Sequence, residues 1–175
     1  AQAVAHRAEQ RDAVLVAGQV DAAVHQGLRG ADMLVRSIGQ AGIDTLFTLS
    51  GNHIMPVFDA SLDGKLKLVH ARHEGAAVHM ADAWARLTDG VGVALVTGGP
   101  GHANAVSALY TALMSESPVV LLSGHAPLAQ RGWGTFQEMD QVAMAQPVVK
   151  AAWAATSADA IASDFAKACN IALSG

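Results

Sequence analysis

The residues with the chemistry for catalysis or binding gather at a few junctions, each where an apolar run gives way to a polar or helical segment. A glutamate can transfer a proton, and a histidine can do so near neutral pH. Glycines let a ligand approach the backbone closely. The junctions are residues 50–53, 72–74, 98–102 and 124 onward, and they hold His53, His73, Glu74, the run Gly98-Gly99-Pro100-Gly101, His102 and His125.

Glu74 has two interpretations when the residues are considered by themselves. A carboxylate in the first turn of a helix is stabilised by the positive end of the helix dipole, which would be a structural role. A carboxylate in a pocket with apolar walls has a raised pKa and can exchange protons with a ligand. The sequence around Glu74 is compatible with both.

Several common kinds of site are disfavoured by spacing. The group His70, His73, Glu74 and His79 lacks the HExxH spacing, so we expect no metal site there. The Gly98–Gly101 run matches neither of the phosphate-binding motifs GxGxxG and GxxxxGK[ST]. Its remaining interpretations are a tight strand-to-helix turn and a backbone surface that a flat ligand can approach. The sequence contains no GxSxG, so a serine hydrolase is not expected.

The segments between these junctions alternate between helical and strand patterns. Near-continuous apolar strands are typical of a sheet covered by helices on both faces, so we expect an α/β fold with a doubly wound, mostly parallel sheet. In such a sheet the junctions after the strands lie at one edge, where ligands bind. The predicted strands are 45–50, 66–70, 91–97 and 118–123, and the predicted helices are 31–41, 54–62, 74–88 and one that follows Gly101 through Met114.

The helical periodicity also predicts which residues are buried. A last helix should be capped by Ser157 and should bury Ile161 and Phe165, with Cys169 as an unreactive thiol at the border of the core. The apolar faces of the two preceding helices are predicted to be Ala77, Met80, Trp84 and Leu87 in the first, and Val106, Leu109, Tyr110, Leu113 and Met114 in the second.

Two segments lack a sustained period. Residues 1–27 are expected to be a weak helix or a frayed extension ahead of a domain that spans 28–175. Residues 124–147 are expected to be an ordered functional loop or short helical turns.

Composition limits the classes of partner. The chain has 175 residues, 51% of them hydrophobic, and a formal charge of −4, which suits one domain with a sizeable core. It lacks a basic stripe for nucleic acid and a run of about 18 apolar residues for a membrane span. These absences leave small molecules or proteins as the expected partners. One cysteine permits no internal disulfide, which agrees with a reducing compartment, so we expect a cytoplasmic protein.

From Gly30 onward the sequence resembles the N-terminal, pyrimidine-binding domain of the thiamine diphosphate enzymes grouped with acetolactate synthase. The string from Arg72 to Arg86 is the most specific part, because it joins a carboxylate to a particular helix pattern. The motifs that carry the resemblance are Gly30-Ala31-Asp32, Gly51-Asn52-His53-Ile54, Arg72-His73-Glu74-Gly75-Ala76-Ala77, Met80-Ala81-Asp82-Ala83-Trp84-Ala85-Arg86, Gly98-Gly99-Pro100-Gly101-His102-Ala103-Asn104 and Phe136-Gln137-Glu138-Met139-Asp140-Gln141.

The resemblance implies roles for these residues. Glu74 would hydrogen-bond N1′ of the cofactor's aminopyrimidine and so promote loss of the thiazolium C2 proton. Gln137 would face the reacting centre. His53 would either relay a proton to the substrate or be a structural loop residue; benzaldehyde lyase and cyclohexanedione hydrolase also have histidine there, whereas acetolactate synthases usually have a small residue. The wall for the pyrimidine would consist of Gly98, Gly99, Pro100, Gly101 and Asn104.

The resemblance further implies an enzyme that decarboxylates a 2-oxo acid and can join the product to a second carbonyl. Such enzymes hold the diphosphate and Mg²⁺ in a C-terminal domain with a GDG motif, which this sequence lacks. We therefore expect an excised domain, inactive alone, that pairs with the diphosphate-binding domain of a second subunit in a homo-oligomer; a need for FAD is left open. The alternatives are a non-catalytic binding module and one half of a split enzyme.

Overall fold

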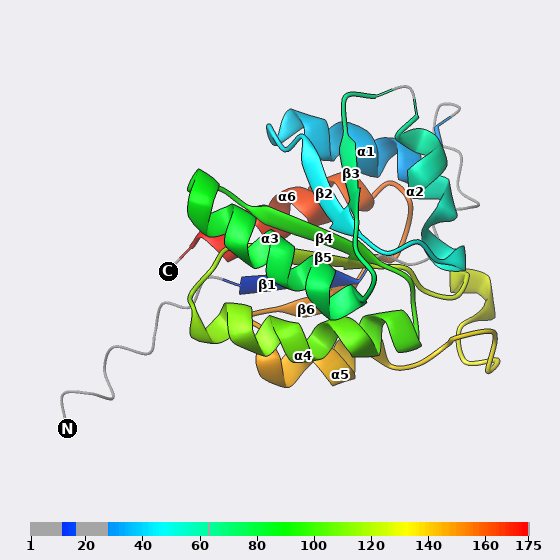
Figure 1. The fold of residues 1–175 in the computed structure, drawn as a ribbon. Coiled ribbons are helices and arrows are strands. Elements are labelled where there is room, and N and C mark those ends of the chain that lie inside the picture. The colour runs from blue at the N-terminus through cyan, green and yellow to red at the C-terminus, as the bar shows by residue number, and fades with distance from the viewer. Residues whose placement is uncertain (1–11, 17–27, 63, 175) are drawn as a thin grey trace.

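The computed structural model describes residues 12–16, 28–62 and 64–174, which form a six-stranded sheet with helices on both faces (Figure 1). The strand order is β3-β2-β4-β5-β1-β6, and every strand pair is parallel. The strands are β1 (Asp12–Val16), β2 (Thr45–Thr48), β3 (Lys67–His70), β4 (Gly92–Val96), β5 (Val119–Ser123) and β6 (Ala152–Ala154). The helices are α1 (Gly30–Gln40), α2 (Met55–Ala60), α3 (Glu74–Thr88), α4 (Pro100–Met114), α5 (Gln141–Ala145) and α6 (Ile161–Leu173), with short 3₁₀ turns at Asn52–Ile54, Leu128–Gln130 and Gln146–Val148.

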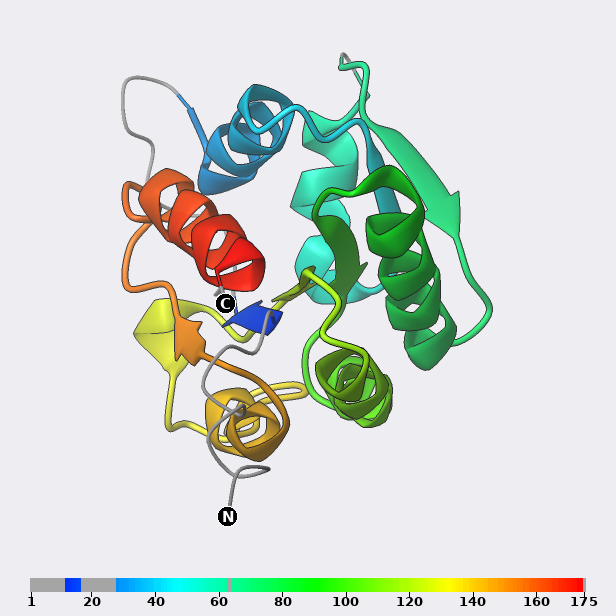
Figure 2. The same cartoon turned by 90° about the vertical axis from the view of Figure 1, so that its left-hand side faces the viewer.

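Two apolar cores lie on opposite faces of the sheet. Figure 2 shows the helices that cover these two faces. Side chains of a strand alternate between the two faces, so Val93 and Leu95 of β4 pack toward α1 and α6, whereas Ala94 and Val96 pack toward α3 and α4. This arrangement confirms the predicted doubly wound α/β fold.

The winding direction changes between β2 and β4. From β2 the chain passes through α2 to β3, toward one end of the strand order, and from β4 it passes through α4 to β5, toward the other end. Because all the strands are parallel, the loops that follow them meet at one edge of the sheet, and ligands of such sheets bind where the direction changes. The predicted functional junctions therefore come together here.

Two strands were not predicted. Residues 12–16, which the sequence indicated as part of a weak helix or frayed extension, form β1 between β5 and β6. No apolar run or alternation in the sequence predicted β6, a strand of only three residues. Both depend on pairing with distant strands, which a local pattern does not reveal. Within residues 124–147 the structure has short helical turns, as expected.

The predicted apolar faces of α3 and α4 are largely wrong. Met80, Trp84, Tyr110 and Met114 are exposed, and the buried positions are mainly small residues such as Ala81 and Ala105. The reason is a close approach: a Cβ added to Gly92 of β4 would lie 1.9 Å from the carbonyl oxygen of Ala81. Where α3 comes this close to β4 only small side chains fit, and several of its larger side chains are exposed instead.

The last helix follows its prediction more closely. Ile161, Phe165 and Cys169 are buried, and burial raises the pKa of the Cys169 thiol to about 11, which keeps it protonated and unreactive. Ser157 does not cap α6 itself, because the helix begins at Ile161; its hydroxyl accepts a hydrogen bond from the backbone N–H of Ala160, 3.2 Å away. None of the described helices is long and apolar enough to cross a membrane.

Candidate cofactor site at the carboxyl edge of the sheet

Glu74 is the first residue of α3 and lies at this edge with 8% of its surface exposed. His73 caps the helix, since its Nδ1 accepts the N–H of Gly75 at 3.0 Å. The side-chain amide of Asn104, from α4, donates to Glu74 Oε2 at 3.0 Å. Among the described residues, nothing donates to Oε1, so one oxygen of the carboxylate remains available to a ligand.

A glycine turn lies beside this carboxylate. A Cβ added to Gly101 would lie 3.3 Å from Glu74 Oε1 and 2.6 Å from Thr97 Cγ2, and one on Gly98 would lie 2.7 Å from the carbonyl oxygen of Gly124. Gly99 has a φ of +58°, a left-handed conformation that favours glycine. Pro100 follows as the first residue of α4, where its missing N–H costs no helical hydrogen bond. The turn therefore offers backbone instead of side chains next to Glu74.

Gln137 reaches the same turn from the segment that follows β5. A Cβ added to Gly99 would lie 2.7 Å from the Gln137 carbonyl oxygen and 2.8 Å from its Cβ. Gln137 itself has a φ of +57°, and such strain in a non-glycine residue is found most often at functional sites. Its Oε1 is buried without a hydrogen-bond partner among the described residues. An orphaned amide oxygen costs roughly 1–3 kcal/mol, which a bound donor would recover.

His53 also lies next to Gly98. A Cβ added to that glycine would lie 3.0 Å from His53 Nδ1, which is in turn 3.4 Å from the hydroxyl oxygen of Thr97. The ring is 5% exposed and its centroid is 6.0 Å from that of Phe136. Burial, and then the electrostatic effect of the neighbouring His125, lower the pKa of His53, which favours the neutral imidazole at pH 7.

Two further buried residues, His102 and Gln141, link segments at the carboxyl edge of the sheet. His102 is fully buried in α4, its Nδ1 is 2.7 Å from the hydroxyl of Ser123, and burial lowers its pKa to about 4. Gln141, 1% exposed, accepts the N–H of Gly99 at 3.2 Å and donates to the carbonyl of Gly124 at 3.0 Å. Sequence reasoning missed Gln141, because an amide that links two distant loops leaves no local signal.

The structure thus brings all the sequence-predicted site residues into one cluster: Glu74 and Asn104 are bonded, Gly101 adjoins Glu74, Gly98 adjoins His53, and Gly99 adjoins Gln137. Within residues 12–16, 28–62 and 64–174, no three His, Cys, Asp or Glu side chains are arranged to hold a metal ion. A buried carboxylate over a bare backbone turn suits a flat, hydrogen-bonding ring.

Comparisons with known proteins point to one family. The family model described as "Thiamine pyrophosphate enzyme, N-terminal TPP binding domain" matches residues 28–144. The acetolactate synthase isozyme 3 large subunit of Escherichia coli is 42% identical over 149 residues, which cover 85% of this chain and 26% of that protein. The acetolactate synthase large subunit of Parasynechococcus marenigrum is 38% identical over 91% of this chain and 27% of its own length.

A relative with a different printed activity is also similar. The 2-hydroxyacyl-CoA lyase 2 of Xenopus laevis is 41% identical over 121 residues, or 69% of this chain and 19% of that protein. In each of these relatives the matched part is about a quarter of the length or less.

Proposed function

The chain belongs to the thiamine pyrophosphate enzymes, through their N-terminal TPP binding domain, and we propose that it supplies the cofactor-activating glutamate of a longer enzyme that decarboxylates 2-oxo acids or joins them to a second carbonyl. The domain proposed for this role is residues 28–175. Because the chain spans about a quarter of its acetolactate synthase relatives, the reaction of the whole enzyme is part of the proposal.

The observation that carries the proposal is the half-satisfied carboxylate of Glu74. Asn104 holds Oε2 at 3.0 Å, which orients the group and leaves Oε1 above the Gly101 position. An orienting hydrogen bond on one oxygen prepares the other to share a proton with a ring nitrogen, here N1′ of an aminopyrimidine. When bound, thiamine diphosphate supplies a carbon nucleophile that attacks the carbonyl of a 2-oxo acid.

The neighbouring residues fit this group. The backbone of Gly98, Gly99 and Gly101 provides a flat wall for the pyrimidine, stiffened by Pro100, and a side chain at these glycines would enter already occupied space. Gln137 would donate its amide at the reacting centre, while its orphaned oxygen receives a donor from the ligand. We propose His53 as a neutral proton donor or acceptor for the substrate oxygen.

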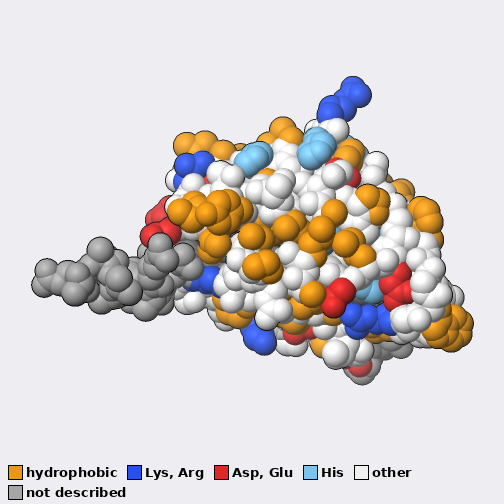
Figure 3. All heavy atoms as spheres, turned by 90° about the horizontal axis from the view of Figure 1, so that it is seen from below, with side chains coloured by type: hydrophobic (Ala, Val, Ile, Leu, Met, Phe, Trp, Pro, Cys, Tyr) orange, Lys and Arg blue, Asp and Glu red, His pale blue; other side chains and the backbone are white. Residues whose placement is uncertain are grey.

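The diphosphate, with Mg²⁺, would be held by a second domain that is contributed by another subunit. The exposed apolar surface supports such pairing: Figure 3 shows hydrophobic side chains gathered on the face seen from below, the side on which α4 and α5 lie. A patch of this kind on a protein surface commonly marks an interface. The large exposed hydrophobic residues on α3, α4 and α5 are Met80, Trp84, Leu87, Tyr110, Met114 and Met144.

We further propose that the enzyme is cytoplasmic and forms homo-oligomers. The single cysteine is buried and suits a reducing compartment, which supports the cytoplasmic location. The exposed hydrophobic residues of α3, α4 and α5 support the oligomer.

The test is C2–H/D exchange of thiamine diphosphate bound to the full-length enzyme. Glu74→Gln should slow the exchange by about two to four orders of magnitude, because an amide cannot share its proton with N1′. Glu116→Gln is the matched control: it makes the same change at an exposed position and should leave the rate unaltered. An unchanged rate in Glu74→Gln, with the fold intact by circular dichroism, would contradict the assignment.

The same measurement separates the role of His53. His53→Ala should leave C2 exchange near the wild-type rate but change turnover or the ratio of products, since this residue faces the substrate and not N1′. A normal product profile would assign His53 a structural role only.

A further inference from the structure

A cavity lies beside the candidate cofactor site, lined mainly by the segment that follows β5. Its volume is about 340 Å³, near the lower end of the roughly 300–1,000 Å³ of small-molecule sites. Neither Glu74 nor Asn104 lines it. Gln141 borders both places, because it lines the cavity and also holds the N–H of Gly99.

The cavity wall contains a guanidinium that the described structure leaves unpaired. The Arg131 side chain makes no hydrogen bond or ion pair with any described residue; only its backbone N–H is bonded, to the carbonyl oxygen of Leu128. The nearby Glu138 is engaged elsewhere: its oxygens accept the N–H of Gly132 at 2.5 Å, the N–H of Thr135 at 3.1 Å and the hydroxyl of Thr135 at 3.4 Å. These bonds, first that of Gly132, lower the pKa of Glu138 and hold the loop that carries Arg131. The guanidinium is therefore free for an external anion.

His125 supplies a hydrogen-bond acceptor to the same cavity. The residue is 4% exposed, and its Nδ1 lies 3.1 Å from the carbonyl oxygen of Ala126. A carbonyl oxygen can only accept, so Nδ1 is the donor in this contact, and in the tautomer that has its proton on Nδ1 the other ring nitrogen, Nε2, presents a lone pair. Nε2 has no partner among the described residues.

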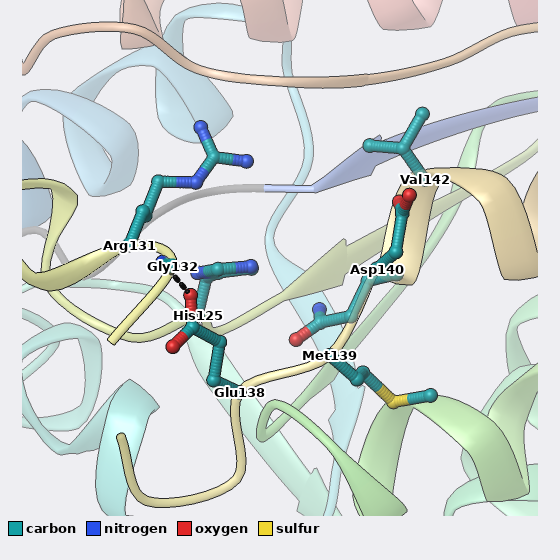
Figure 4. A pocket seen from close by; sticks show the side chains of 8 residues that line it. His125, Arg131, Gly132, Glu138, Met139, Asp140 and Val142 are labelled. Atoms are coloured by element: carbon teal, nitrogen blue, oxygen red, sulfur yellow. Dashed lines mark hydrogen bonds between the residues drawn. The ribbon is translucent and has the colours of Figure 1, made fainter. Parts of the chain in front are cut away.

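Asp140 provides a second acceptor across the cavity. Its Oδ1 accepts the N–H of Ala143 at 2.9 Å as the cap of α5, and no described residue donates to Oδ2. Figure 4 shows Arg131 and His125 on one side of the cavity and Asp140 and Val142 on the other. The wall therefore combines one donor cation with two acceptors and a small apolar surface.

From this arrangement we propose that the cavity binds a small carboxylic acid that carries a hydrogen-bond donor next to its carboxylate. The carboxylate pairs with Arg131, for which a guanidinium gives two parallel hydrogen bonds. The donor, a hydroxyl or an ammonium group, reaches Nε2 of His125 or Oδ2 of Asp140. The site is distinct from the cofactor site and does not depend on the function proposed above.

The test is an NMR titration of the full chain, without thiamine diphosphate, with three acids of the same carbon skeleton: lactate, alanine and propionate. Lactate or alanine should shift the backbone amides of Gly132 and Val142, and propionate, which lacks the donor, should bind at least about fivefold more weakly. Binding of lactate alone assigns the donor as a hydroxyl, and binding of alanine alone as an ammonium group facing Asp140.

Two variants make the result decisive. Arg131→Gln should weaken binding about tenfold or more, because it removes the charged partner of the carboxylate. Arg36→Gln, the same change at an exposed position of α1, should have no effect. The proposal is overturned if none of the acids shifts these amides, if propionate binds as tightly as the others, or if both variants bind alike.

Discussion

The carboxylate of Glu74 and the amide of Gln137 share one property at the scale of single residues. Each is mostly enclosed by protein, and each keeps an oxygen for which the described residues provide no donor. Buried polar atoms are ordinarily paired, so the unpartnered buried oxygen of Gln137, next to the half-bonded carboxylate of Glu74, indicates a ligand site beside the glycine turn. His102 nearby is bonded at one ring nitrogen only: its Nδ1 is 2.7 Å from the hydroxyl of Ser123, whereas its buried Nε2 has no hydrogen-bond partner among the described residues.

His102 leads to a prediction about pH. Burial lowers its pKa to about 4, against about 6.5 in the unfolded chain, so between these values the unfolded state binds more protons. The contribution of His102 to stability is complete above pH 6.5 and is lost as the pH falls toward 4. Replacement by Gln should therefore flatten the pH dependence.

The measurement is the free energy of unfolding in urea at pH 7 and pH 5. The wild type should lose about 1–2 kcal/mol more than His102→Gln over this interval. His53 also has a lowered pKa and remains in the variant, so some dependence will persist. Identical losses in the two proteins would show that His102 is not the group responsible.

At the scale of elements, the close packing of α3 against β4 controls the position of Glu74. Glu74 begins α3, so a helix displaced from the sheet would move the carboxylate away from Asn104. The contact depends on Gly92, whose α-hydrogen lies under the backbone of Ala81. Small residues on α3 are therefore a requirement of the site as well as of the core.

Gly92→Ala should destabilise the fold by roughly 1–3 kcal/mol or more, because its Cβ would lie 1.9 Å from a backbone oxygen that cannot rotate away. The matched control is Gly39→Ala in α1, where an added Cβ meets nothing within 4 Å. That change should stabilise the protein by about 0.5–1 kcal/mol through helix propensity. Urea unfolding of both variants tests the pair, and equal stabilities would refute the close-packing argument.

At the scale of the whole molecule, the exposed large side chains of α3 and α4 support the proposed pairing with a second subunit. Trp84, Tyr110 and Met114 are 38%, 53% and 64% exposed. Exposed aromatic and methionine side chains on adjoining helices are typical of the centre of a protein interface. The patch is on the side of the sheet that also carries Glu74 at the start of α3, as expected for a site completed by another subunit.

The double substitution Tyr110→Glu and Met114→Glu should reduce oligomerisation of the longer enzyme, because forming the contact would then bury two unpaired carboxylates. Sedimentation velocity at several protein concentrations measures the change. Leu62→Glu is the control, because Leu62 is also exposed but follows α2, away from the patch. If the double variant and the control sediment alike, the patch is not the interface.

From the sequence alone, the fold class, most strand positions and the set of candidate site residues could be predicted. The reason is that these features are encoded locally: apolar runs, glycine turns and the string around Glu74 each occupy a short segment. The parallel order of strands and helices then implies that their junctions share an edge.

Only the tertiary structure decided which way the helices face and how the site is supported. Met80 and Trp84 satisfy a helical period as well as Ala77 and Ala81 do, and the choice between them depends on the distance to β4. The strands β1 and β6, the link that Gln141 makes between Gly99 and Gly124, and the cavity around Arg131 all join residues far apart in the chain. Contacts of this kind depend on packing in three dimensions, which no periodicity of the sequence records.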